Sequence, residues 1–241
     1  MPDTLLTELN DGVLTITLNN PTKHNCMGFE MLYALRITFS QAARDNNVKV
    51  ILITGAGERS FSTGANIKEF NAFEDKEVER WIIDGNRIFN QLEKLSKPTV
   101  ALINGYAMGG GLELALCCDF RIAMANALLA SPELKNGWLP GWGGMTRLRK
   151  LVGISATKQI VLLSGNLNAE QSLKLGLVTQ VLTAEQKQEF LDEFLDKLKN
   201  IRPEVFALAK AAIMDEYRTT EGSDLYFDVM AVDVARKEPK S

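Results

Sequence analysis

Histidine and cysteine are scarce in this chain, and their scarcity narrows the possible chemistry. Among 241 residues there is one histidine, His24, and there are three cysteines. His24 lies in a polar turn without cysteine or carboxylate partners at ligand spacing, which argues against a metal site or a Ser-His nucleophile. Cys117 and Cys118 are adjacent, have no metal-ligand spacing and would strain to form a disulfide. We expect these two and Cys26 to be reduced packing residues.

Long hydrophobic runs and an excess of positive charge are also missing. No apolar run approaches the roughly 18 residues of a membrane helix, and residues 1–8 lack both a basic n-region and an Arg-rich amphipathic pattern. The sequence therefore predicts a cytoplasmic protein. The net charge is −3 at pH 7 and the pI is about 5.4, so no large positive field exists to hold nucleic acid or an anionic membrane surface. An anionic ligand would need a local basic site.

The composition that is present fits one globular domain, with 46% hydrophobic and 24% charged residues. Apolar strand-like runs alternate with segments of helical spacing, a pattern typical of an α/β domain. The expected strands are 13–18, 50–53, 100–103, 120–124 and 178–182. The expected helices are 29–44, 78–95, 109–118, 145–151, 156–163 and 169–175, one after the capping sequence 183–186, one from Pro203 and one at 223–236, and residues 55–68 are expected as a loop.

Two glutamates stand 20 residues apart, each just after a turn marked by glycine or proline. Glu113 follows a triple glycine and lies in the first turn of an apolar helix, where a carboxylate buried without purpose would be costly. Glu133 follows Ser131 and Pro132 in a loop. Taken singly, Glu113 is read as a helix-dipole partner and Glu133 as a solvated loop residue. If the two carboxyl groups lie together in one apolar cleft, one can act as an acid and the other as a base.

The triple glycine 109–111 also predicts a backbone anion site. Glycine lets the backbone approach a ligand without a Cβ in the way, and the N–H of Gly110 would be supported by the positive end of the helix dipole. The segment containing Gly64 and Ala65 could supply a second N–H from a different part of the chain. Tight turns with close helix packing are the alternative reading of these glycines.

These segments, together with 62–69 and 131–144, resemble the crotonase superfamily, specifically the enoyl-CoA hydratases. The resemblance runs from about Gly12 to about Lys237, with the blocks in the family's order. It implies an α/β crotonase-like fold of repeated ββα units. It also implies a core at 1–198 that carries the CoA-ester site, and a C-terminal helical segment at 199–241 that packs on neighbouring subunits in a trimer or a dimer of trimers.

The resemblance assigns catalytic roles as well. It implies that Glu133 delivers a proton to the α-carbon of a 2-enoyl thioester, and that Glu113 holds and activates the water that attacks the β-carbon. Ala65 and Gly110 correspond to the oxyanion hole, whose N–H groups stabilise the enolate oxygen. No metal or redox cofactor is implied, because coenzyme A enters as part of the substrate.

Substrate-binding positions follow from the same match. Residues corresponding to Ala65, Asn66, Ile67 and Lys68 contact coenzyme A in the family, and Lys68 would supply the local positive charge that the acidic chain lacks. Lys23 is a weaker candidate for the phosphates. Further candidates are Gly110 again and three residues near the acyl chain: Gly141, Trp138 and Trp142.

Three departures from the family pattern stand out. Asn66 replaces a usual aspartate, which puts in doubt a polar contact near the nucleotide. Trp138 and Trp142 stand where short-chain hydratases commonly have smaller residues, and they belong either to the core or to a narrowed acyl pocket. The chain ends at Ser241, short of an aromatic and basic terminal segment, so either the nucleotide end of the site is more open or the chain is a shortened form.

Four alternatives to a hydratase remain open from the sequence. The first is a Δ3,Δ2-enoyl-CoA isomerase, which can work with one carboxylate at the Glu133 position and is disfavoured by Glu113. The second is a related dehydratase that acts on carrier-protein thioesters. The third is an RNA-binding relative, which would need a basic comb, whereas the first helix offers only Arg36 and Arg44. The fourth is a non-catalytic CoA-binding scaffold, which is disfavoured because both carboxylates and both oxyanion segments are present.

Overall fold

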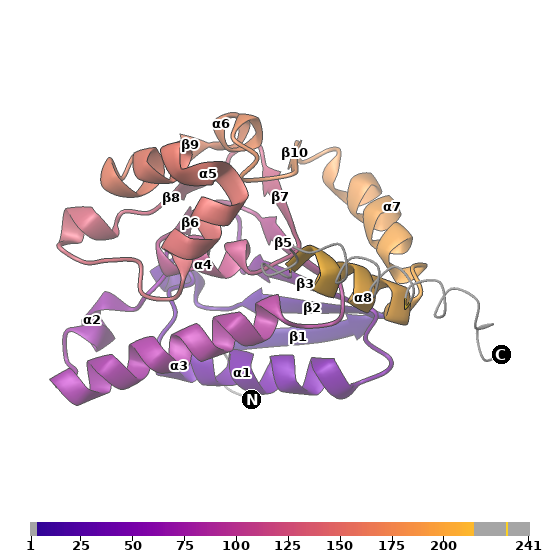
Figure 1. Ribbon diagram of the computed structural model, residues 1–241, viewed down its shortest axis with the longest axis horizontal. Helices are drawn as coiled ribbons and strands as arrows, with labels where there is room; N and C mark the ends of the chain where they lie inside the picture. Colours follow the sequence, from indigo (N-terminus) through magenta and orange to yellow (C-terminus); the bar gives the residue numbers. More distant parts are fainter. Residues whose placement is uncertain (1–3, 215–229, 231–241) are drawn as a thin grey trace.

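A computed structural model describes residues 4–214 and 230 (Figure 1). Its strands are β1 Leu5–Asn10, β2 Val13–Leu18, β3 Val50–Gly55, β4 Ser60–Ser62, β5 Thr99–Ile103, β6 Tyr106–Met108, β7 Phe120–Met124, β8 Leu128–Ala130, β9 Leu167–Asn168 and β10 Gln180–Leu182. Its α-helices are α1 Phe29–Arg44, α2 Ile67–Phe70, α3 Asp75–Glu93, α4 Gly110–Leu116, α5 Gly144–Leu162, α6 Ala169–Lys174, α7 Lys187–Lys199 and α8 Pro203–Met214. The 3-10 turns η1 Pro21–Lys23 and η2 Glu133–Asn136 complete the set.

The larger sheet has the order β1-β2-β3-β5-β7-β10 and is parallel except for the β1–β2 hairpin. Alternate residues of its central strands face opposite sides, as the period of two in a strand requires. In β3, Ile51 and Ile53 join the core under α1 and α3, whereas Val50 and Leu52 pack toward α7. Both faces are covered, which explains why the central strands are continuous apolar runs.

The smaller sheet has the order β4-β6-β8-β9, and its first three strands are parallel. In each repeat of the chain, one strand enters the larger sheet and the next short strand enters the smaller one, as β5 and β6 do before α4. These are the repeated ββα units that the resemblance implies. Because β4, β6 and β8 run side by side in the same direction, the three loops that follow them emerge at one edge.

The long elements agree with the sequence-based predictions, and the short ones do not. Residues 55–68 were expected as a loop, but they contain β4 and lead into α2. Strands β1, β6, β8 and β9 were not predicted, because strands of two or three residues carry no readable period and β1 is an edge strand with five exposed residues. Two helices were expected at 145–163, and the helical run is indeed broken at Gly153, which has a φ of 76°.

Several element boundaries also shift. The helix after the triple glycine ends at Leu116 rather than Cys118, the strand expected at 178–182 begins at Gln180, and α7 begins at Lys187, after the capping sequence. In that sequence the Gln186 side chain accepts a hydrogen bond from the Thr183 N–H at 3.1 Å. The helix expected at 223–236 lies outside the described residues, apart from position 230.

The three cysteines are buried and free, in agreement with the packing role expected for them. Within residues 4–214 and 230, no helix is both long enough and apolar enough to cross a membrane.

Candidate active site

The candidate site lies where the parallel strands β4, β6 and β8 end. Met108 of β6 pairs with Ala130 of β8, and the Gly109 N–H continues the ladder by donating to the Ala130 carbonyl at 2.9 Å. Each strand is followed by a segment singled out in the sequence: 63–66 after β4, 109–113 after β6 and 131–136 after β8. The fold therefore brings together three segments that are far apart in the chain.

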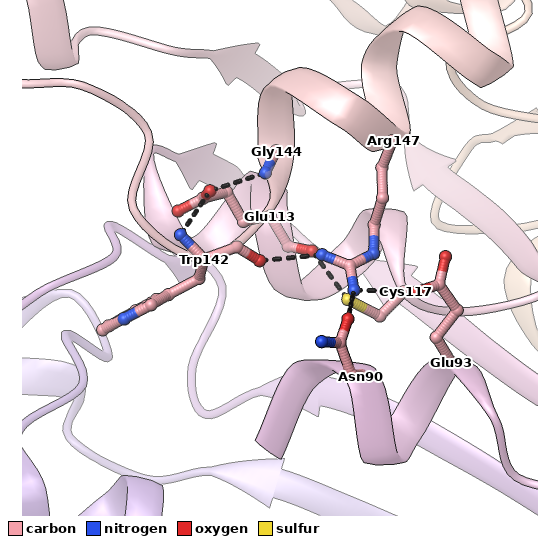
Figure 2. Close-up of polar contacts among 7 residues, drawn as sticks. All are labelled: Asn90, Glu93, Glu113, Cys117, Trp142, Gly144 and Arg147. Atoms are coloured by element: carbon pink, nitrogen blue, oxygen red, sulfur yellow. Dashed lines mark hydrogen bonds and ion pairs between the residues drawn. The ribbon is translucent and has the colours of Figure 1, made fainter. Parts of the chain in front are cut away.

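Glu113 is held in a buried position on α4, with a residue exposure of 4%. Its Oε1 accepts hydrogen bonds from the N–H of Trp142 at 2.9 Å and from the N–H of Gly144 at 2.7 Å (Figure 2). Its Oε2 takes no partner among the described residues, and the side chain lines a cavity. One oxygen thus fixes the carboxylate while the other is available to a ligand.

Glu133 approaches the same cavity from η2. Its Oε2 accepts a hydrogen bond from Ser131 Oγ at 2.8 Å, whereas its Oε1 is buried without a hydrogen-bond partner in the described part of the chain. A buried acceptor without a partner costs free energy unless a ligand or water completes it. A hydrogen-bond donor from a ligand or a water molecule would therefore satisfy this oxygen.

Burial perturbs both carboxyl groups. It raises the pKa of Glu113 to about 7, and the negative charge of Glu133 acts in the same direction, while the hydrogen bonds from Gly144 and Trp142 oppose it. Burial also raises the pKa of Glu133, opposed by the hydrogen bond from Ser131. A carboxyl group with a pKa of about 7, as Glu113 has, can exchange protons near neutral pH, which is the property that general acid–base catalysis needs.

The backbone N–H groups of Ala65 and Gly110, predicted as an oxyanion hole, belong to neighbouring segments that both line the cavity. Met27 exchanges hydrogen bonds with the residues on either side of Ala65, donating to the Gly64 carbonyl at 2.7 Å and accepting from the Asn66 N–H at 2.9 Å. The N–H of Ala65 therefore points away from Met27. Gly64, with a φ of 86°, lies so close that a Cβ on it would be 2.6 Å from the Gly110 nitrogen. The two donors thus come from segments in direct contact.

A cavity of about 370 Å³ joins these groups. It is lined by eight of the eleven residues proposed from the sequence: Ala65, Ile67, Gly110, Glu113, Glu133, Trp138, Gly141 and Trp142. Asn66, Lys68 and Lys23 do not line it. The sequence-based reasoning did not propose the remaining wall, which consists of Thr63, Phe70, Trp81, Ile82, Gly109, Pro132, Asn136, Leu139 and Pro140.

Asn66 has a structural contact that accounts for its departure from the family pattern. Its Nδ2 donates to Glu69 Oε2 at 3.1 Å, and Glu69 Oε1 accepts from the Phe29 N–H at the start of α1, at 3.0 Å. An aspartate at position 66 would place two carboxylates side by side. Asn66 and Glu69 therefore tie α2 to α1 and hold the segment that carries the Ala65 N–H.

The basic candidates lie outside the cavity. Lys68 on α2 and Lys23 in η1 are both exposed, so a contact of either one with phosphate groups stays a prediction. His24 does not line the cavity either, and its Nδ1 pairs with Ser60 Oγ at 3.0 Å.

The two tryptophans differ in how deeply they are buried. Trp142 is 2% exposed and fills the space beside two glycines, since a Cβ on Gly110 would lie 2.5 Å from its ring and a Cβ on Gly85 of α3 would overlap its indole nitrogen. Trp138 is half-buried and packs on Phe70, with ring centroids 4.9 Å apart. Trp142 is therefore a core residue that also lines the cavity, and its part in narrowing an acyl pocket stays a prediction. Trp138 belongs to the cavity wall.

The chain is similar to known proteins both in sequence and in structure. The enoyl-CoA hydratase/isomerase family model matches residues 8–239. The short-chain-enoyl-CoA hydratase of Clostridium acetobutylicum is 35% identical over 209 residues, which is 87% of this chain and 80% of that protein. The crotonyl-CoA hydratase of Syntrophomonas wolfei is 32% identical over 88% of this chain and 78% of that protein.

The structural comparison leads to the same group. An enoyl-CoA hydratase from Bacillus anthracis superposes with a TM-score of 0.92 at 30% identity, covering 98% of this chain and 92% of that chain. The enoyl-CoA hydratase from Thermoplasma volcanium gives 0.90 at 31% identity, covering 98% and 94%. The chain belongs to the enoyl-CoA hydratase/isomerase family and has the crotonase fold. The predictions of family, fold, enzyme class and enoyl-CoA hydratase function are confirmed.

Proposed function

We propose that this protein hydrates a short 2-enoyl-CoA thioester with Glu113 and Glu133 as the proton-transfer pair. The observation that carries the proposal is their common setting. The buried Glu113 and the half-buried Glu133 both have a raised pKa and face one cavity, and each has an oxygen without a hydrogen-bond partner among the described residues. A binding scaffold would gain nothing from such a pair, because burying carboxyl groups is costly.

The reaction follows from what each group can do. Ionised Glu113 accepts a proton from water as the water oxygen bonds to the β-carbon, and the electrons of the double bond move to the thioester oxygen as an enolate. The N–H groups of Ala65 and Gly110 stabilise that charge. Protonated Glu133 then donates to the α-carbon, so that one water is added and the pair has exchanged protonation states. A solvent proton exchange restores them.

Activity with a series of thioesters tests this function. We expect loss of the conjugated thioester absorbance with crotonyl-CoA and with longer 2-enoyl-CoA esters, without added metal or redox cofactor. Activity with the same 2-enoyl group attached to a carrier protein tests the alternative in which the substrate is a carrier-protein thioester. A 3-enoyl-CoA, which lacks the conjugated absorbance until it is isomerised, tests the isomerase alternative. Turnover of the 3-enoyl ester alone would overturn the proposal.

A small acyl space is favoured by the aromatic wall of the cavity. Phe70, Trp81, Trp138 and Trp142 all contribute to it, and Trp81 packs edge-on to Trp142 with ring centroids 4.6 Å apart. The named short-chain and crotonyl-CoA relatives support the same choice. We infer that crotonyl-sized acyl groups are preferred over long ones.

Replacing Trp138 with alanine is expected to raise kcat/KM for long enoyl chains relative to crotonyl-CoA by about tenfold or more, since one methylene-sized change in a pocket shifts discrimination by about 10–200-fold. Trp142→Ala serves as the contrast. Its ring is fully buried, so a loss of about 3–5 kcal/mol in the free energy of unfolding is expected. Chain-length profiles and thermal unfolding of both variants check this, and an unchanged profile in Trp138→Ala would remove that residue from the acyl wall.

The rate of hydration is expected to depend on pH near neutrality. The pKa of Glu113 is raised to about 7, and this residue must be ionised to accept a proton. Its active form is therefore lost as pH falls through that value, and kcat/KM should fall by about tenfold per pH unit on the acid side. A profile of kcat/KM from about pH 5 to about pH 9 checks this, with the carboxyl groups of Glu113 and Glu133 treated as a coupled pair. A flat acid side would contradict the base role of Glu113.

The remaining predictions concern assembly and surroundings. We propose a trimer or a dimer of trimers formed through the C-terminal segment 199–241, in a cytoplasmic setting, with coenzyme A held near Lys68. Light scattering after size exclusion, with and without the segment, tests the first point. The acidic pI supports the absence of RNA binding, and filter binding at low salt tests it.

A further inference from the structure

A buried cation lies behind the catalytic carboxylate. Arg147, in the first turn of α5, has a side chain that is only 6% exposed. Its Nη1 donates to the Trp142 carbonyl at 2.7 Å, and its Nη2 donates to Asn90 Oδ1 at 2.6 Å and to Glu93 Oε2 at 2.8 Å (Figure 2). Both acceptor side chains belong to the last turns of α3. Arg147 therefore connects α3 to the loop that precedes its own helix.

That loop is the one that holds Glu113. Trp142 gives its N–H to Glu113 and its carbonyl to Arg147, so one peptide segment is fixed from both sides. Gly143 turns the chain with a φ of 92°, and a Cβ there would overlap the guanidinium. Gly144 then supplies the second N–H to Glu113. The loop is thus shaped around Arg147, and the shape determines where both donors point.

We propose that Arg147 is a positioning residue for Glu113, acting through the 142–144 loop, and that Glu93 and Asn90 hold Arg147 in place. The proposal rests on the function proposed for Glu113. A buried carboxylate aligned by two backbone N–H groups stays aligned only if those groups cannot move, and a misplacement of about 1 Å can cost about 10²-fold in rate. The planar fork of arginine suits this task because it binds three acceptors at fixed angles.

Arg147 also acts on Glu113 through its charge. The charged and titratable groups around Glu113 are Glu133 from η2 and Arg147 from α5. Those around Arg147 are Glu93 from α3, Cys117 just after α4 and Glu113 itself. The positive charge favours the ionised form of Glu113, and Glu93 partly cancels it. The two variants that remove one or the other charge should therefore move the acid side of the pH profile in opposite directions.

The test uses Arg147→Lys, Arg147→Met and Glu93→Gln in the full chain with crotonyl-CoA. In both Arg147 variants we expect kcat to fall by about 10-fold to 10²-fold with KM changed by less than about threefold. Arg147→Met should also shift the acid side of the profile to higher pH, while Arg147→Lys, which keeps the charge, should leave it nearly in place. In Glu93→Gln, which keeps a hydrogen-bond acceptor, the acid side should shift to lower pH.

The control is Arg80→Met, which removes an exposed arginine paired with Asp84 on α3, away from the cavity. It should leave kcat and the pH profile unchanged.

A purely structural role of Arg147 predicts lower unfolding temperatures for its variants, with kcat per folded molecule and the pH profile unchanged. That result would overturn the proposal. If Arg147→Met does not fold, the shift of the acid side of the pH profile in Glu93→Gln tests the proposal, and an unshifted profile in that variant would overturn it. A wild-type protein without hydratase activity would remove the underlying function, whereas normal activity in folded Arg147 variants would remove this inference alone.

Discussion

Replacing Glu133 with glutamine is expected to lower kcat for hydration by about 10²–10⁴-fold, the usual contribution of a general acid or base. Glutamine keeps the shape and can still accept the hydrogen bond from Ser131 Oγ, but it has no proton to deliver to the α-carbon. Glu113→Gln should lose activity on the same scale, because its amide cannot take a proton from water. Initial rates with crotonyl-CoA, together with binding of the ester to each variant, measure the loss.

The matched control is Glu170→Gln, which makes the same chemical change at an exposed position on α6. Its kcat should equal that of the wild type. The double variant Glu113→Gln, Glu133→Gln should lose less than the product of the single effects, since residues that act on one water behave as a unit. Turnover close to wild type in either single variant, with binding intact, would disprove the assigned pair.

Stability should change in the opposite direction to activity. A carboxyl group whose pKa is raised on folding, from 4.5 to about 7 for Glu113, binds its proton more tightly in the folded state. The stability that it contributes is therefore present at low pH and is lost as pH rises through this window. Above about pH 7, Glu113→Gln removes a buried charge while keeping an acceptor for Trp142 and Gly144, so its unfolding temperature should equal or exceed that of the wild type.

The carboxylate pair could be found from sequence because its signal is local. Glu113 follows shortly after a triple glycine and Glu133 directly follows a proline, and the family resemblance assigned both residues to one catalytic site. The groups that hold Glu113 could not be found in this way. Its donors, the N–H groups of Trp142 and Gly144, lie 29 and 31 residues away in the chain, and any residue type can supply a backbone N–H.

The cavity wall illustrates a second limit. Trp81 and Ile82 are neighbours in the helix expected at 78–95, and both line the cavity, although Trp81 is 6% exposed and Ile82 is 36% exposed. Helical periodicity shows which residues avoid water, but it does not distinguish packing in a core from lining a ligand site. Only the tertiary packing of α3 against the 138–142 segment shows which of its apolar residues line the cavity.

The small sheet escaped prediction for a related reason. Strands β6 and β8 have three residues each, too few for an alternating pattern to be recognised. Yet their pairing places Gly109 next to the Glu133 side chain, since a Cβ on Gly109 would lie 3.2 Å from Glu133 Oε1. The family resemblance supplied this architecture, whereas local propensity did not.

Replacing Gly110 with alanine is expected to lower kcat by about 10²–10³-fold, the loss typical of one oxyanion donor. A Cβ at this position would lie 2.5 Å and 2.8 Å from two ring atoms of Trp142, and 3.4 Å from the Cα of Gly64. The first turn of α4 or the indole must therefore move. Because the Gly110 N–H is fixed only by the backbone, even a small rotation turns it away from the enolate oxygen. Initial rates with crotonyl-CoA, together with binding of the ester, measure the loss.

Two further variants separate this cause from general destabilisation. Gly165→Ala adds the same methyl group where nothing lies within 4 Å of the new Cβ and φ is not positive, and it should keep full activity. Trp142→Leu removes the ring atoms that the new Cβ would meet. If the steric explanation is correct, Gly110→Ala should cost much less in the Trp142→Leu background than in the wild type, because sites in contact are not additive. An equal loss in both backgrounds would show that the ring contact is not the cause. Full activity of Gly110→Ala alone would remove Gly110 from the oxyanion hole.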